Sequence, residues 1–286
     1  MDGIIDILLD TIWDSLRLIP FLFLTYLVME TLEHKAGEKA RRRIQGAGKL
    51  GPLWGAALGV IPHGFSAAAS GLYMGRVITL GTLMSIYLST SEEMLPVLLA
   101  EQVEIGVILK ILGLKMLIGM VSGYLVEFVC RKIWKLQPHE MDIHAICETE
   151  HCGCEGGILK SAVSHTVKIC LYIFLVSLLL NGVVEWIGEE RLGSLFVDIP
   201  LVGEMAAALV GMIPNCASSV VITELYLDGV IRTSQLMAGL LVNTGVGILI
   251  ILRQGHDRKE KLGIIAALYG IAVFWGVVIG AAGVWF

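Results

Sequence analysis

The chain contains 286 residues, of which 56% are hydrophobic and only 16% are charged, and its formal net charge is −5. Soluble domains usually carry about a quarter charged residues, so this composition excludes a soluble enzyme, a disordered regulator and a nucleic-acid-binding protein. Long apolar runs, such as residues 169–180 and 264–286, instead predict an all-α polytopic membrane protein.

The first segment is acidic and contains Asp2, Asp6, Asp10 and Asp14. Because a secretory signal needs a basic segment before its short apolar core, no cleaved signal is expected. Residues 1–16 are predicted to form an interfacial segment that leads into the first membrane span.

Most Lys and Arg residues lie in three short segments, 34–49, 130–160 and 253–261, and the segments between them are acidic. Basic residues are enriched in the cytoplasmic loops of membrane proteins. The three basic segments are therefore assigned to the cytoplasm.

This orientation restricts how the apolar segments cross the bilayer. The stretches 51–74, 77–100 and 105–129 separate the first two basic segments, and three full crossings would place residue 130 on the wrong side. An Ile-Pro-His-Gly sequence at 61–64 and an Ile-Pro-Asn-Cys sequence at 213–216 interrupt two stretches, so we predict two re-entrant helical hairpins, at 51–74 and 199–227. With ten hydrophobic segments in all, the six full spans are then expected at about residues 17–33, 76–100, 105–129, 163–187, 229–252 and 263–285.

The two interrupted segments belong to an internal repeat. Residues 59–66 align with 211–218 at an offset of 152, and farther on an offset of 153 pairs the Leu-Met sequence at 83–84 with that at 236–237. Since the hairpins open to opposite sides, the sequence predicts two inverted repeats, 17–129 and 163–286, joined by a cytoplasmic loop at 130–162. Inverted repeats with broken helices are typical of secondary transporters, although Pro and Gly also kink ordinary spans.

A polar run, Ser-Thr-Ser-Glu-Glu at 89–93, falls near the centre of the span predicted at 76–100. An ionisable group inside a bilayer costs roughly 2.5–3.5 kcal/mol, so two carboxylates at this depth need a cation or protons. The alternative is a span that ends at residue 89 and leaves the carboxylates in an external loop. The offset of 153 places Asn243 and Thr244 opposite Thr90 and Ser91. Together with the hairpin tips, these breaks give the candidate substrate-binding residues: His63, Ser66, Ser89, Thr90, Ser91, Glu92, Glu93, Asn215, Cys216, Ser218, Ser219, Asn243 and Thr244.

Several of these residues are candidate metal ligands: His63, Glu92, Glu93, Asn215, Cys216 and Asn243. Carboxylate and amide oxygens suit Mn²⁺ or Mg²⁺, while imidazole and thiolate shift the preference toward transition metals. Half-helix N-termini at the hairpin tips favour anions instead, so an anion coupled to protons on the two glutamates stays open.

The cytoplasmic loop contains a second set of ligand types: His144, Cys147, His151, Cys152 and Cys154. Thiolate and imidazole groups form tetrahedral sites for soft metals, so this loop is predicted to capture or sense a cytosolic metal ion. The alternative is a solvated acidic linker, because the spacing matches no known zinc finger.

Three features together resemble a known family. They are the Thr-Ser-Glu-Glu run at 90–93 with Pro96, the paired Ile-Pro tips, and the Cys-Gly-Cys-Glu-Gly-Gly run at 152–157. In this combination the chain, from about residue 17 onward, resembles the bacterial and archaeal ten-transmembrane heavy-metal exporters, whose members are also called manganese transporters or arsenic efflux proteins. The resemblance implies efflux of a metal or metalloid across the prokaryotic cytoplasmic (inner) membrane.

The sequence thus predicts a secondary-active exporter of a divalent, Mn²⁺-like transition metal, driven by exchange for protons. Neither enzymatic activity nor a resident cofactor is expected, and the sequence lacks the Gly-rich loop of nucleotide-binding proteins. Two alternatives stay open: a proton- or sodium-coupled permease for an anion or an arsenite-type metalloid, and a membrane metal sensor. The expected partners are the lipid bilayer, the metal ion and protons, without nucleic acid; a homodimer is compatible with the sequence.

Overall fold

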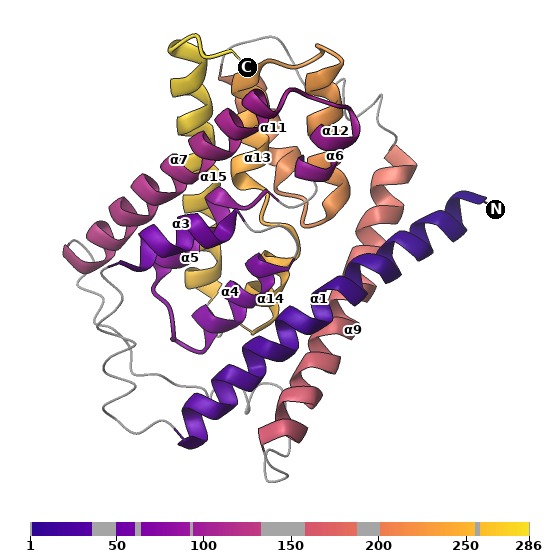
Figure 1. Ribbon diagram of the computed structural model, residues 1–286, viewed down its shortest axis with the longest axis vertical. Helices are drawn as coiled ribbons and strands as arrows, with labels where there is room; N and C mark the ends of the chain where they lie inside the picture. Colours follow the sequence, from indigo (N-terminus) through magenta and orange to yellow (C-terminus); the bar gives the residue numbers. More distant parts are fainter. Residues whose placement is uncertain are drawn as a thin grey trace.

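The computed structural model describes residues 2–35, 50–60, 64–91, 94–132, 158–187, 201–254 and 258–285. Every regular element in these ranges is an α-helix, as predicted for the fold class. The first half contains α1 (Asp2–Lys35), α3 (Gly51–Gly59), α4 (Phe65–Met74), α5 (Leu80–Ser89), α6 (Met94–Ala100) and α7 (Ile105–Lys132). The second half contains α9 (Ile158–Ile187), α11 (Val202–Gly211), α12 (Cys216–Leu227), α13 (Thr233–Val242), α14 (Gly247–Gln254) and α15 (Arg258–Ala281) (Figure 1).

Several helices are long and apolar enough to cross a bilayer, which supports the predicted multi-pass membrane protein. In the described residues there are four such segments, Thr11–Val28 in α1, α7, Leu159–Val183 in α9, and α15. The pair α13 and α14 makes a fifth if its 40° bend lies within one span. The remaining predicted span, 76–100, is divided between α5 and α6, on either side of residues 90–93.

The first helix, α1, runs without interruption from Asp2 to Lys35 and includes Pro20. The boundary predicted at residue 16, between an interfacial segment and the first span, therefore corresponds to no break in the helix. Leu18, Leu22 and Tyr26 follow one another at four-residue spacing and are buried, which gives α1 one face that packs in the core.

The helices that follow the two predicted hairpin tips have different starts. Asn215 precedes α12, and its Oδ1 accepts a hydrogen bond from the Ser218 amide at 3.1 Å, as an N-cap residue does. Gly64 precedes α4 with a φ of 78°, a left-handed conformation that glycine adopts without steric penalty. Residues 61–63, which include His63, lie outside the described ranges.

The two halves pack in the same pattern. In the first half α5 packs between α3 and α7, and in the second half α13 packs between α11 and α15. Across the halves, α4 packs against α14, α12 packs against α6, and α5 contacts α13. The Leu-Met pairs that the repeat aligns, at 83–84 and 236–237, are all buried in the resulting core. Helices α1 and α9 lie side by side along one edge of the molecule (Figure 1).

The long helices expose apolar side chains on their outer faces. Leu109, Leu125 and Phe128 on α7 are all more than half exposed, as are Leu171 and Leu175 on α9. Soluble monomers rarely expose such large contiguous apolar surfaces, whereas the hydrocarbon core of a bilayer covers them without cost.

Two glycines allow half-helices to approach α5 and α13 closely. A Cβ atom at Gly59 would lie 2.7 Å from the carbonyl oxygen of Ile86, and one at Gly211 would lie 2.8 Å from the carbonyl carbon of Gly239. Only glycine fits at either place. In the repeat Gly59 aligns with Gly211 at the offset of 152, and Ile86 aligns with Gly239 at the offset of 153.

Candidate functional site

Most of the predicted substrate-binding residues lie in the described ranges. Those whose side chains are described are all buried: Ser66, Ser89, Thr90, Ser91, Asn215, Ser218, Ser219, Asn243 and Thr244. Cys216 begins α12, but its side chain is not among those described. The other predicted residues, including those of the accessory loop, lie outside the described ranges: His63, Glu92, Glu93, His144, Cys147, His151, Cys152 and Cys154.

In the second half, the structure brings the predicted hairpin tip and the predicted break into contact. The Asn243 Nδ2 group donates a hydrogen bond to the Ser218 hydroxyl at 2.9 Å, and Asn243 Oδ1 accepts one from the Gly245 amide at 2.8 Å. Ser218 in turn donates through its hydroxyl to the carbonyl of Asn215, at 3.1 Å. These bonds fix the start of α12 against the bend between α13 and α14.

The same network continues to two residues that sequence reasoning did not select. Asn215 Nδ2 donates to Asn181 Oδ1 at 3.2 Å, and Asn181 Nδ2 donates to the Thr11 hydroxyl at 3.0 Å. The amides therefore link the hairpin tip of the second half to α9 and then to α1. A lone Asn within the apolar run of α9 was the available signal, because a buried amide needs hydrogen-bond partners.

In the first half, the start of α4, at the predicted hairpin tip, lies against the start of α14 in the second half. Ser66 is fully buried near the start of α4, and its carbonyl accepts a hydrogen bond from the Ser70 hydroxyl at 2.6 Å. The Ser70 hydroxyl also lies 2.7 Å from the Tyr87 hydroxyl of α5. A Cβ atom at Gly247 would lie 2.9 Å from the Ser66 carbonyl. Two helix N-termini, of α4 and α14, thus meet at this point, and such N-termini carry partial positive charge.

The serines around the first predicted break donate to backbone carbonyls. Ser89 donates to the Ser85 carbonyl at 2.8 Å, and Ser91 donates to the Val60 carbonyl at 2.9 Å. Ser91 therefore ties the break after α5 to the end of α3, and both hydroxyls can still accept a hydrogen bond.

The structure adds one charged residue to the site, Lys115. It is only 1% exposed, and its Nζ donates to the Leu240 carbonyl at 2.8 Å, in the last turn of α13. One turn farther along α7, a Cβ atom at Gly119 would lie 3.2 Å from the Ser89 Cβ. The ammonium group thus lies between the ends of α5 and α13, and a helix C-terminus stabilises a cation. In the sequence, the only sign of this role was a lysine inside a predicted span.

Within the described residues, no group of three or more His, Cys, Asp or Glu side chains could hold a metal ion. The two glutamates on which the predicted metal site depends, Glu92 and Glu93, lie outside these residues. The described part of the site provides amide and hydroxyl groups together with the Lys115 ammonium. Neutral oxygens of this kind can complete the coordination of a cation or hydrogen-bond an anion.

The two halves are also joined away from these breaks, by an ion pair next to a basic segment. Arg76 contacts Glu260 through two nitrogen–oxygen pairs at 3.1 and 3.3 Å, and the Tyr73 hydroxyl donates to Glu260 at 2.5 Å. Burial of Tyr73 and its hydrogen bond to Glu260 raise the pKa of the phenol above its usual range. The end of α4 is thereby fastened to the start of α15.

No known protein-family model, no curated protein and no solved structure matches this sequence. What the site does therefore has to follow from its own residues.

Proposed function

We propose that the protein is a secondary-active membrane transporter, with its substrate site between two broken spans that belong to two inverted repeats. One observation carries this proposal: the start of α4 in the first half meets the start of α14 in the second half at Ser66 and Gly247. Both elements begin at an interruption that the sequence pattern predicts. Secondary transporters typically bind substrate where discontinuous helices of two repeats meet.

The matched packing supports the inverted repeats. The contacts of Gly59 with Ile86 and of Gly211 with Gly239 occur at positions that the repeat aligns. The cross-half contacts are also reciprocal, because α4 packs on α14 while α12 packs on α6. This reciprocity is what a two-fold relation between the halves requires.

We further propose that the substrate is a divalent, Mn²⁺-like cation that leaves the cell in exchange for protons. Glu92 and Glu93 directly follow Ser91, so the chain places two carboxylates next to the break after α5. Asn243, from the matching break, adds an amide oxygen. Hard oxygen ligands favour Mn²⁺ among transition metals, and carboxylates that bind a cation release protons when they do so. The resemblance to heavy-metal exporters supports the same direction of transport.

A second candidate function rests on Lys115. A buried ammonium group at the end of α13, together with the two helix N-termini where α4 meets α14, favours an anionic substrate, carried together with protons or Na⁺. On this second proposal the protein is a permease for an oxyanion or an arsenite-type metalloid, and the two glutamates bind the coupling ion.

Flux into proteoliposomes tests the two candidates directly. The purified protein would be compared with a Glu92→Gln/Glu93→Gln variant, in a panel of Mn²⁺, Zn²⁺, arsenite and phosphate, with an imposed pH gradient. The matched control is Glu101→Gln/Glu104→Gln, which removes the same charges from two exposed residues. We expect the Glu92/Glu93 variant to lose Mn²⁺ flux and the control variant to keep it.

Lys115→Met separates the candidates further, with Lys110→Met on the exposed face of the same helix as its control. If the substrate is an anion, Lys115→Met should abolish its flux. If the substrate is a cation, its flux should persist in Lys115→Met, because the variant only removes a positive charge that repels the cation. Mn²⁺ flux that survives removal of both carboxylates would contradict the cation proposal. If no member of the panel is transported, the remaining alternative is a membrane metal sensor. The metal response of such a sensor should disappear when residues 139–155 are deleted.

A further inference from the structure

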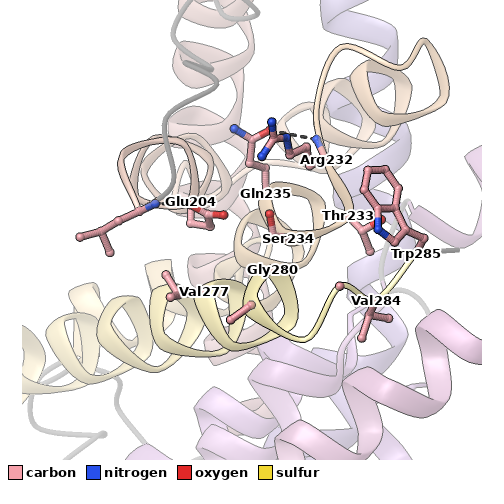
Figure 2. Close-up of a pocket in the computed structure, with 12 residues that line it drawn as sticks. Glu204, Arg232, Thr233, Ser234, Gln235, Val277, Gly280, Val284 and Trp285 are labelled. Carbon is pink, nitrogen blue, oxygen red and sulfur yellow. Dashed lines mark hydrogen bonds between the residues drawn. The ribbon is translucent and has the colours of Figure 1, made fainter.

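A pocket of about 310 Å³ lies at one end of the second half, away from the broken spans. Its walls come from the first turn of α11, the first turn of α13 and the last turns of α15 with the residues that follow (Figure 2). The residues that give it its chemistry are Glu204, Arg232, Thr233, Ser234, Gln235 and Trp285.

The pocket contains a buried carboxylate. Glu204 is 6% exposed, and its Oε2 accepts a hydrogen bond from the Leu201 amide at 2.7 Å. Leu201 has a φ of 72°, so the capping bond holds a leucine in a conformation that it rarely adopts. Within the described ranges, no Lys, Arg or His forms an ion pair with Glu204. Its second oxygen, Oε1, lies 3.6 Å from the position that a Cβ atom at Gly280 would occupy.

Two residues with hydroxyl groups also line the pocket. Thr233 is 2% exposed, and its hydroxyl has no hydrogen-bond partner among the described residues. Ser234 is 4% exposed, and its hydroxyl lies 3.4 Å from the same Cβ position at Gly280 that Glu204 approaches. Buried hydroxyls are rarely left without a partner. Glu204 and Ser234, which both approach Gly280, therefore form an acceptor wall that suits a group with several hydrogen-bond donors, and Thr233 lies beside Trp285 in the same pocket (Figure 2).

Side chains with hydrogen-bond donors also line the pocket. In Figure 2 the side chains of Arg232 and Gln235 lie together among the residues that line the pocket. Gln235 Oε1 accepts a hydrogen bond from the Arg232 amide at 2.9 Å. A guanidinium group presents paired N–H donors that match a phosphate. The remaining surface is apolar and includes Val277 and Trp285.

The pocket lies where lipid headgroups would lie. Helix α15 begins with Arg258 and Lys259 and ends at Ala281, so the pocket is at the end opposite to its basic turn. A helix of 24 residues is about 36 Å long, which spans the hydrocarbon core. Trp285, 76% exposed beyond this end, is a residue type enriched at the membrane–water interface.

We propose that this pocket binds the headgroup of a phospholipid that carries a primary ammonium group, such as an ethanolamine phospholipid. The ammonium group donates to Glu204 and to the Ser234 hydroxyl, and the phosphate accepts from Arg232. The glycerol and the first methylenes of the chains lie along Val277 and Trp285. The zwitterion brings one cation and one anion to a pocket that Glu204 and Arg232 both line.

This assignment discriminates among lipids. A choline headgroup has the same charges, but its methylated nitrogen cannot donate a hydrogen bond to Glu204 or Ser234. A glycerol headgroup has no cation and would leave the buried carboxylate without a counter-charge, which is costly. Since a charge-assisted hydrogen bond is worth about a tenfold change in affinity, the ethanolamine lipid should bind about tenfold more tightly than either.

Lipid titration of the purified full chain, followed by native mass spectrometry, tests the proposal. Dioleoyl phosphatidylethanolamine, phosphatidylcholine and phosphatidylglycerol would be compared on wild type, Glu204→Gln and Glu127→Gln. Glu127 is the matched control, because it is a partly buried carboxylate of the first half that pairs with Arg131 at 2.6 Å. The wild type and Glu127→Gln are expected to prefer the ethanolamine lipid about tenfold, and Glu204→Gln is expected to bind all three lipids equally.

A second variant keeps the proposal testable if Glu204→Gln fails to fold. Gly280→Val places a side chain against Ser234 and fills the pocket without removing a charge, so it should also abolish the preference. If the headgroup alone is enough for binding, soluble glycerophosphoethanolamine should compete with the ethanolamine lipid for the pocket, and glycerophosphocholine should not. If neither compound competes, the lipid chains contribute to binding, and the preference among the three lipids remains the test of the proposal.

Equal affinity of the wild type for the three lipids would overturn the proposal, as would a preference that Glu204→Gln retains. A third result would assign the pocket to a bare cation instead. In that case NaCl would stabilise the wild type in lipid-free micelles, Glu204→Gln would remove this stabilisation, and the wild type would show no preference among the lipids.

Discussion

The Trp275 indole donates a hydrogen bond to the Ser122 hydroxyl at 2.9 Å, although the two residues are 153 positions apart. That separation equals the offset of the proposed internal repeat, so in that repeat each residue is the counterpart of the other. Two equivalent positions can touch in this way only where they lie close to the axis that relates the halves. The bond between α7 and α15 therefore marks the place where the proposed two-fold axis passes.

Ser122→Ala should destabilise the protein, because it leaves the partly buried indole N–H without its acceptor. An unsatisfied buried donor costs about 1–3 kcal/mol. The melting temperature in detergent would measure the effect, with Trp275→Phe as the reciprocal change. Trp54→Phe, at a tryptophan that is 62% exposed, is the control and should leave the melting temperature unchanged. A loss in Ser122→Ala no larger than in the control would show that the bond contributes nothing.

Gly59→Ala and Gly211→Ala should each destabilise the fold by about 1–3 kcal/mol, because the added methyl group meets backbone atoms of α5 or α13. Gly113→Ala on α7 is the matched control, since a Cβ atom there meets nothing within 4 Å. It should be neutral or stabilising by up to about 1 kcal/mol, because alanine favours a helix over glycine. Chemical or thermal unfolding compares all three, and equal effects would contradict the close packing of the half-helices.

The positions of the helices were largely predictable from the sequence. The apolar runs and the interruptions at 61–64 and 213–216 determine helix length and helix ends locally, and the structure places helix boundaries at both. The boundary at residue 16 between an interfacial segment and the first span stays a prediction, because α1 is continuous through it. Aspartates at four-residue spacing are equally compatible with a helix that simply continues, as α1 does.

The site was predictable only in part. Asn215, Ser218 and Asn243 were selected from sequence position alone, and the structure joins them by hydrogen bonds. Lys115 and Asn181 were not selected, because their importance depends on which helix packs against theirs. The role of a lysine in a span becomes clear only when its partner is known, here the Leu240 carbonyl, which accepts a hydrogen bond from the Lys115 ammonium group.

Asn243→Asp should increase the affinity for Mn²⁺ by about tenfold if the substrate is a cation, because it adds a carboxylate beside the bend. The fold should tolerate the change, since the carboxylate still accepts from the Gly245 amide and the Ser218 hydroxyl can turn from the Asn215 carbonyl to donate to it. Calorimetry on the purified protein measures the affinity. Gln102→Glu adds the same charge at an exposed turn and should leave the affinity unchanged. Weaker Mn²⁺ binding in Asn243→Asp would favour the anion instead.

Alkaline pH should weaken the link between α4 and α15. The pKa of Tyr73 is raised in the folded protein, so its stabilising contribution is complete below the usual tyrosine pKa of about 10 and is lost as pH rises above it. The slope is about 1.4 kcal/mol per pH unit for one proton. Tyr73→Phe should therefore flatten the fall in stability between about pH 10 and 11, at a cost of about 1 kcal/mol at neutral pH from the lost hydrogen bond to Glu260.

Melting temperatures measured from pH 8 to pH 11 would show this difference. Tyr124→Phe, on an exposed part of α7, should keep the wild-type profile. An identical slope in wild type and Tyr73→Phe would mean that the phenol does not contribute to the alkaline loss.

The shortness of α13 has an electrical consequence. Its ten residues extend about 15 Å, half the thickness of a hydrocarbon core of about 30 Å. An ion held at the bend after α13 would therefore divide the membrane voltage into two nearly equal drops, one toward each face. Moving one charge through a full 100 mV involves about 2.3 kcal/mol, so loading and release would each carry about half of this energy. In the proposed transport cycle, the rates of both loading and release would then depend on the membrane voltage.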